Sequence, residues 1–257
     1  MADYRRLVSV ITFCAAGVST LFSQQNQKGP KENPAGPKEQ FSVMLLPGQK
    51  LPAGMNLFYL PKPETPVAVT LATYGRSGPI PRAASGKLVF ATQRTGTGNA
   101  PVYIPVVEAA WPGSSKRALI LLAVVPASPG QSATVQALAM DDSLEEFPSN
   151  TVKILNFSGT PLLAKFGDFE GILNAGPSGI FRYPAQTLKT VESGEMAKIP
   201  FTLGVREKGE TARVLYSGYV EGWPKCRTLI FALPFAPDQK ERLPVRMVRD
   251  SAPASPK

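Results

Sequence analysis

The sequence predicts an all-β protein with two tandem immunoglobulin-like β-sandwich domains that follow a signal peptide and a flexible tether. Apolar residues come in short runs rich in Val, Ile, Leu and Phe, separated by clusters of Gly, Pro, Asn and Asp. No stretch of a dozen residues has the three-and-four spacing of an amphipathic helix. The 26 Pro and 22 Gly make up 48 of 257 residues, below the roughly 25 to 30% that is typical of disordered chains. The expected strands include LFYL, VAVTLA, KLVFA, ALILLAVV, VKILNF, RVLYSGYV and TLIFALPF.

The N-terminal segment has the pattern of a secretory signal. Two arginines precede Leu7–Phe22, a 16-residue uncharged stretch that is shorter than the about 20 residues of a membrane span. We expect a signal peptide over residues 1–23, cleaved near Ser23, with an uncleaved anchor as the alternative. Residues 24–40 lack large apolar side chains and are expected to form a disordered tether. The predicted location is extracytoplasmic, either periplasmic or secreted.

Cleavage near Ser23 would remove Cys14 and leave Cys226 as the one thiol, so no intramolecular disulfide could form. Cys226 stands just before RTLIFAL and is expected to be a small buried residue at a strand start. An intermolecular bridge or a reactive thiol is the alternative.

The two halves of the chain share landmarks in the same order, which predicts an internal duplication. VYIPVVEAAWP ends at Pro112 and LYSGYVEGWP at Pro224, and each is followed by an Arg that opens an apolar run. KLVF from Lys87 corresponds to KIPF from Lys198, and the Thr-Pro before VAVTL to the one before LLAKF. The number of residues that separates matching landmarks is not constant along the chain. An insertion of about 16 residues in the second half explains the difference and is expected to form an extra hairpin.

These landmarks place the first sandwich at residues 41–142, a linker at 143–150, the second sandwich at 151–250 and a disordered tail at 251–257. The second copy opens with VKILNFSGTPLLAKFG, continues through an AGPSG turn and reaches Trp-Pro and RTLIFAL. It resembles uncharacterised secreted bacterial domains that begin with an Asn-centred hairpin. The resemblance implies a β-sandwich and secretion but no activity.

The repeated Trp-Pro motif is the most specific feature of the sequence. An exposed Trp beside a Glu could stack on a sugar ring or on an aromatic side chain of a partner, and two copies would add avidity. The alternative is a packing anchor at the sandwich edge, with Glu and Arg paired across the turn. The candidate binding residues are Trp111, Arg117, Trp223, Arg227, Glu108 and Glu221.

A secreted hydrolase that uses two carboxylates is the rival hypothesis, tested first at Asp168, Glu170, Glu108 or Glu221. Paired acids occur at Asp141/Asp142, Glu145/Glu146 and Asp168/Glu170, but adjacent residues in a strand point to opposite faces and are poor partners for each other. Asp141, Asp142, Glu145 and Glu146 lie in or beside the linker and are expected to be solvated. They lack the ligand spacing of a calcium loop, and no metal, cofactor or catalytic residue is predicted.

The chain has no His, which excludes every His-dependent catalytic triad and metal site. Its net charge is +9, or +8 without residues 1–23, which hold two Arg and one Asp. The positive charge is spread, apart from Arg242, Arg246 and Arg249, so no nucleic-acid site is predicted. A non-catalytic structural or binding protein with diffuse affinity for an anionic envelope polymer is the first hypothesis. An envelope subunit that pairs with another envelope protein through sheet edges is a third.

Two short motifs are assigned to turns. RTGTGN from Arg94 contains a lone GxG without a following helix, so it predicts a hairpin turn and not a phosphate site. Asn156 and Ser158 form a glycosylation sequon, but their place in a hairpin favours turn chemistry.

Overall fold

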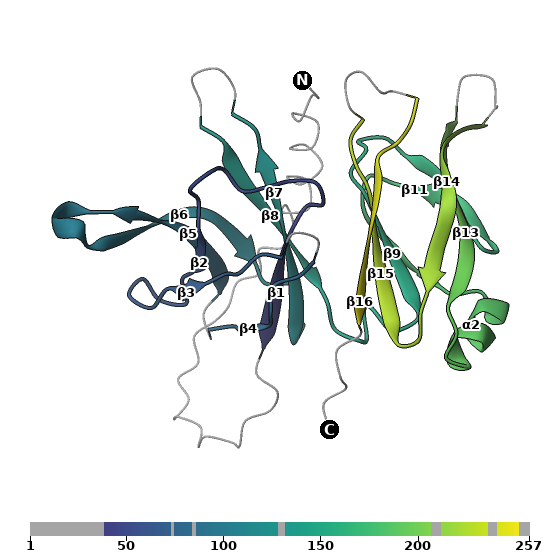
Figure 1. The fold of residues 1–257 in the computed structure, drawn as a ribbon, viewed down its shortest axis with the longest axis horizontal. Coiled ribbons are helices and arrows are strands. Elements are labelled where there is room, and N and C mark those ends of the chain that lie inside the picture. The colour runs from purple at the N-terminus through teal and green to yellow at the C-terminus, as the bar shows by residue number, and fades with distance from the viewer. Residues whose placement is uncertain are drawn as a thin grey trace, which may run out of the picture.

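Figure 1 shows a stack of four β-sheets, as described by a computed structural model of the chain. The structure describes residues 39–72, 75–83, 86–127, 132–206, 212–235 and 241–251, and the backbone alone at Ser178. The signal peptide, most of the tether, Cys14 and the tail beyond residue 251 lie outside these residues. The all-β fold class is confirmed. No helix within the described ranges is long and apolar enough to cross a bilayer.

The first half of the chain supplies two four-stranded sheets. Sheet I, at one outer side, has the order β3-β2-β5-β6, and sheet II has the order β4-β1-β7-β8. Strands β1 and β7 are parallel, and the other neighbours in both sheets are antiparallel. The strands are β1 (Gln40–Leu45), β2 (Leu57–Tyr59), β3 (Val67–Ala68), β4 (Ile80–Pro81), β5 (Lys87–Thr95), β6 (Pro101–Ala110), β7 (Arg117–Val125) and β8 (Thr134–Asp141).

The second half repeats this order and these directions. Sheet III is β12-β9-β15-β16, with β9 and β15 parallel, and sheet IV is β11-β10-β13-β14. Each strand of the second half therefore takes the place of the strand eight numbers before it. The strands are β9 (Thr151–Asn156), β10 (Leu162–Phe166), β11 (Phe169–Leu173), β12 (Gly176–Arg182), β13 (Ala197–Arg206), β14 (Ala212–Gly222), β15 (Cys226–Ala232) and β16 (Val245–Ser251).

Three apolar cores separate the four sheets. One core joins sheets I and II around Phe41, Tyr59 and Phe90, and another joins sheets III and IV around Phe166 and Phe201. The middle core joins sheets II and III and takes residues from both halves, including Met44 and Leu121 from one and Phe157 and Phe231 from the other. The halves thus pack against each other over a shared apolar interface, and burial of that surface favours their association.

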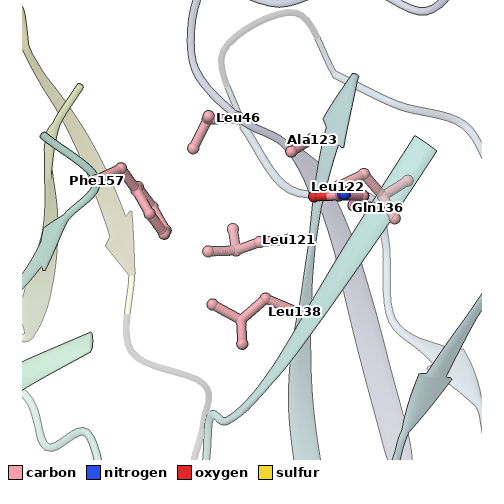
Figure 2. A pocket seen from close by; sticks show the side chains of 7 residues that line it. All are labelled: Leu46, Leu121, Leu122, Ala123, Gln136, Leu138 and Phe157. Carbon is pink, nitrogen blue, oxygen red and sulfur yellow. The ribbon is translucent and has the colours of Figure 1, made fainter. Parts of the chain in front are cut away.

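Figure 2 shows the open end of this middle core, where Leu46, Leu121 and Leu138 extend toward Phe157 across the space between the sheets. The remaining cavity has a volume of about 10 Å³, no more than one water molecule needs. It is an incompletely filled end of the interface, too small for an organic ligand.

Two of the sequence landmarks occupy matching positions in the strand pairing. Arg117 is the first residue of β7 and lies opposite Gln40, and Arg227 lies opposite Thr151 at the same place in the β15–β9 ladder. The predicted correspondence of the two Thr-Pro pairs is wrong. Pro66 immediately precedes β3, whereas Pro161 precedes β10, which takes the place of β2 and not of β3. Similar turn chemistry, not a common position, produced that match.

The inserted segment of the second half contains a helix instead of the expected extra hairpin. Helix α2 (Ala185–Glu192) follows Pro184, which is its N-cap, and ends shortly before Gly194, whose φ is +95°. It spans eight residues and buries Val191 against the outer core. So short a helix shows too little periodicity for recognition from sequence.

The hairpin turn at RTGTGN is confirmed, whereas the hairpin expected around Asn156 and Ser158 is wrong, because Asn156 ends β9 of sheet III and the turn after it leads to β10 of sheet IV. Residues 96–100, which include the 3-10 turn η2 (Thr97–Asn99), join β5 to β6. Asn156 is fully buried, and its side-chain amide donates to the carbonyls of Thr160 and Leu173 while its oxygen accepts from Ser158. The side-chain nitrogen to which a glycan would be attached is therefore already hydrogen-bonded to the backbone on both sides of the β10–β11 hairpin. Cys226, at the start of β15, is a free thiol and is half-buried.

Candidate functional site

The two Trp residues of the repeated motif do not occupy matching positions. Phe90 lies opposite Val107 in the β5–β6 ladder, and Phe201, which takes the place of Phe90, lies opposite Gly218. Trp111 is the fourth residue after Val107, whereas Trp223 is the fifth after Gly218. A shift of one residue along a strand reverses the face to which a side chain points, so the two indoles have different surroundings.

Trp111 is a packing residue of the first half. It is half-buried against the core of sheets I and II, and its Nε1 donates to the Ser115 carbonyl at 2.8 Å. The guanidinium of Arg82 lies 4.4 Å from the centre of the ring. Tyr183 takes the place of Arg82 in the second half and packs against Gly222. The anchor role expected for both Trp residues is found at Trp111 alone.

Arg227 is the centre of a buried ion cluster between the two halves. Its side chain is 1% exposed, and its Nη2 binds the Oδ2 atoms of Asp142 at 2.9 Å and Asp250 at 3.0 Å. Its Nη1 donates to the carbonyls of Asp142 and Phe147, and the guanidinium lies 4.7 Å from the Phe147 ring centre. Arg76 binds the same two carboxylates at 2.5 and 3.2 Å. Two Arg and two Asp make the cluster neutral.

This cluster corrects the expectation of a solvated linker. Asp142 and Phe147 are buried, whereas Glu145 and Glu146 are exposed as expected. Near the cluster, burial lowers the pKa of Arg117, and the charge of Asp142 opposes that effect.

A groove lies between β14, the edge strand of sheet IV, and β16, the edge strand of sheet III. Two bridges span the gap: the amide of Leu243, just before β16, donates to the Leu215 carbonyl, and Arg249 binds Glu221 at 3.0 Å. Both bridges join residues 28 positions apart, so the two segments run side by side in one direction. The groove has a volume of about 300 Å³ and is lined by Tyr219, Val220, Glu221, Thr228, Met247 and Arg249.

The rim of the groove carries an exposed aromatic and ionic group. Trp223 is 36% exposed and Tyr219 is 61% exposed. One carboxylate oxygen of Glu221 accepts from Trp223 Nε1 at 3.2 Å and from Arg249. The Arg249 guanidinium lies 4.9 Å from the centre of the Trp223 ring. The three side chains fix one another in place, and their charges cancel.

Two hydroxyl groups at the base of this region have no hydrogen-bond partner. Thr228 and Tyr183 are 3% and 2% exposed, and neither hydroxyl makes a hydrogen bond of acceptable geometry within the described structure. Burial raises the pKa of the Tyr183 hydroxyl, and the nearby Thr228 hydroxyl opposes that effect.

The expected Glu–Arg pairing across each turn is wrong in both halves. Glu108 binds Lys87 at 2.9 Å on sheet I, and Glu221 binds Arg249 and not Arg227 on the opposite side of the stack. Arg227 instead binds Asp142 and Asp250, and the charges that act on Arg117 include Asp142 and Arg227.

The carboxylates named for hydrolysis do not converge. Glu108 and Glu221 lie on sheets I and IV, at the two outer sides of the stack. Glu170 lies on β11 and forms an ion pair with Lys165 at 3.8 Å, while Asp168 lies in the turn before it. Among the described residues, no group of three or more Cys, Asp or Glu side chains could hold a metal ion.

Of the sequence candidates, the structure brings together Glu221 and Trp223 at the groove. It places Trp111 and Arg227 in packing or ionic contacts, and Glu108 on a distant sheet. No motif in the sequence identified Tyr219, Thr228 or Met247 as site residues. Side chains two residues apart in a strand lie on the same face, so Tyr219 could have been inferred from Glu221. Thr228 and Met247 could not, because only the tertiary packing brings β16 beside β14.

No protein-family model matches this chain, and no curated protein matches it in sequence. The resemblance to secreted bacterial domains therefore stays a prediction.

Proposed function

We propose that this protein is a non-catalytic, extracytoplasmic binding protein whose binding site is the groove between β14 and β16. The observation that carries this proposal is the contrast between that groove and the candidate carboxylates. The groove gathers exposed aromatic and basic side chains and the buried Thr228 around one carboxylate, Glu221. Of the other acidic candidates, Glu108 and Glu170 lie on different sheets and each pairs with a Lys, whereas glycoside hydrolysis requires two carboxyl groups about 5 to 10 Å apart.

We also propose that the net positive charge draws the protein to anionic envelope surfaces. The buried cluster at the centre of the stack is neutral, so it contributes nothing to the formal charge of +9. The excess of Lys and Arg therefore lies outside it, and long-range attraction to an anionic polymer or membrane follows from that excess. The signal-like segment before residue 24 supports an extracytoplasmic location.

Co-sedimentation of the protein, expressed from residue 24, with lipid vesicles tests this attraction. Vesicles with phosphatidylglycerol should retain it at 20 mM NaCl and release most of it at 500 mM NaCl, because salt screens exposed charges. Vesicles of phosphatidylcholine alone provide the matched neutral control. Equal binding to both vesicles, or binding that resists salt, would contradict the electrostatic part of the proposal.

We further propose that the two halves arose by duplication of one β-sandwich. The support is the repeated strand order, including a parallel pair at the same place in sheets II and III, and the matching positions of Arg117 and Arg227. The immunoglobulin-like classification remains a prediction.

Pairing through a sheet edge is a second candidate function, favoured by one observation. Strand β14 is an eleven-residue edge strand that contains neither Pro nor Lys, whereas β6, in the same place in sheet I, contains Pro101 and Pro105. Such an edge lacks two common protections against strand addition. Substitution Ser217→Pro should abolish any dimer seen by light scattering, while Val102→Pro in β6 should leave it intact.

A further inference from the structure

We propose that the groove between β14 and β16 binds a neutral sugar ring that stacks on Tyr219. This inference rests on the proposed binding function, and it names the ligand class of the same site. Tyr219 is 61% exposed on the groove wall, which the partly buried Met247 also lines. The C–H face of a pyranose needs this kind of flat apolar contact, and its hydroxyls need polar groups at the ring's edge.

The charge of the groove selects a neutral ligand. Arg249 and Glu221 are paired at 3.0 Å, so the site has both a cationic donor and an anionic acceptor but little net charge. A sugar hydroxyl can donate to the carboxylate while its neighbour accepts from the guanidinium. An anionic group placed beside Arg249 would also face Glu221, and like-charge repulsion would offset the attraction.

The pair is also held ready for a ligand. The indole Nε1 of Trp223 donates to the same carboxylate oxygen as Arg249, and the guanidinium lies over the indole ring. A polar pair that is fixed before binding loses less conformational entropy when the ligand arrives.

The unpaired hydroxyl of Thr228 gives an independent indication of a polar ligand. Thr228 lines the groove and is 97% buried (3% exposed), and its Oγ1 has no hydrogen-bond partner in the described structure. An unpaired buried hydroxyl is costly, and a ligand hydroxyl that reached it would remove that cost.

The first half shows that packing alone does not require these groups. Ala118 occupies the place of Thr228, and Glu108, Ala110 and Asp141 occupy the places of Tyr219, Glu221 and Arg249. In that half β6 and β8 lie against each other, while β14 and β16 have no comparable backbone approach within the described residues. The same strand arrangement is thus closed in one half and open in the other.

Titration of the Trp111→Phe variant with neutral oligosaccharides tests the inference. In this variant all Trp fluorescence comes from Trp223, which lies at the rim of the groove. The panel contains hexamers of β-1,4-linked glucose, xylose and N-acetylglucosamine and of α-1,4-linked glucose. At least one should change the Trp223 emission, with a Kd that differs less than twofold between 50 and 500 mM NaCl. In the same background Tyr219→Ala should weaken binding at least tenfold, and Thr228→Val should weaken it measurably.

Ile172→Ala is the matched control, since Ile172 is 58% exposed on sheet IV but lies on β11, away from the groove. It should leave the Kd unchanged, and equal urea midpoints should show that every variant folds. Absence of binding across the panel, or binding unaffected by Tyr219→Ala, would overturn the sugar assignment.

The same titration separates this inference from the electrostatic proposal. Binding that disappears at 500 mM NaCl also overturns the sugar assignment, although it agrees with surface adhesion. If the protein binds a sugar at high salt but does not bind anionic vesicles, the sugar site in the groove is supported and the electrostatic attraction to anionic surfaces is contradicted.

Discussion

Asp142 and Asp250 occupy corresponding positions in the two halves of the chain and bind the same guanidinium group, that of Arg227. Asp142 lies beside Arg117 at the end of the β7–β8 pair, and Asp250 lies opposite Arg227 in the β15–β16 pair. The arginine of the second half therefore joins the equivalent carboxylates of both halves. Together with Arg76, which binds the same two carboxylates, it places a buried ionic contact beside the apolar interface and links the halves.

Substitution Arg227→Met should lower the free energy of unfolding by about 3 to 5 kcal/mol, because it leaves two carboxylates to one guanidinium, that of Arg76, and so an uncompensated buried negative charge. Urea denaturation at pH 7 measures the change. Arg117→Met is the control at the corresponding position; Arg117 is half-buried, and its loss should cost less. The double variant Arg227→Met, Asp142→Asn should recover part of the loss, since it removes the unpaired charge. A cost of under about 1 kcal/mol for Arg227→Met would contradict the central role of the cluster.

The two Trp residues should behave as one structural and one surface residue. Trp111→Phe should cost about 1 to 2 kcal/mol, because it loses the bond to Ser115 and part of the contact with Arg82. Trp223→Phe should cost less than about 1 kcal/mol. The protein that retains only Trp223 should emit at the longer wavelength and be quenched more by acrylamide. Equal spectra and quenching in the two variants would mean that the one-residue shift is wrong.

Gly204→Ala should destabilise the fold by about 1 to 3 kcal/mol through a steric clash at the β13–β14 irregularity. An added Cβ would lie 2.7 Å from the Arg213 carbonyl oxygen, which is backbone and cannot turn away. Thermal and urea unfolding measure the cost. Gly78→Ala is the matched control, because a Cβ there meets no atom within 4 Å. Similar midpoints for both variants would argue against this close approach of the strands.

Lys153→Met should stabilise the protein at pH 7, and the gain should shrink as the pH approaches 10.5. Burial lowers the pKa of Lys153 from its ordinary value of 10.5, although Asp142 and other acids oppose the shift. Between the folded and unfolded pKa values the unfolded chain binds more protons, so wild-type stability rises with pH there. The unfavourable contribution is complete below the folded pKa and is removed above the unfolded one. Urea midpoints of both proteins from pH 7 to 10 check the trend, and a difference that grows with pH would contradict it.

The sequence by itself determined the all-β class, most of the strands and the RTGTGN turn, because strand propensity and turn chemistry are local properties. It also identified Arg117 and Arg227 as equivalent, since each opens a similar apolar strand. The short helix α2 escaped notice because eight residues give little periodicity.

Only the tertiary structure decided what the candidate residues do. The sequence aligns Trp111 with Trp223, yet a one-residue difference in register places the first against a core and the second at the rim of a groove. Asp142 belongs to an acidic linker in the sequence but is buried beside Arg227, 85 residues away. The groove itself requires β14 and β16 to lie side by side without joining. Register and sheet packing depend on contacts between distant residues, and no local pattern encodes them.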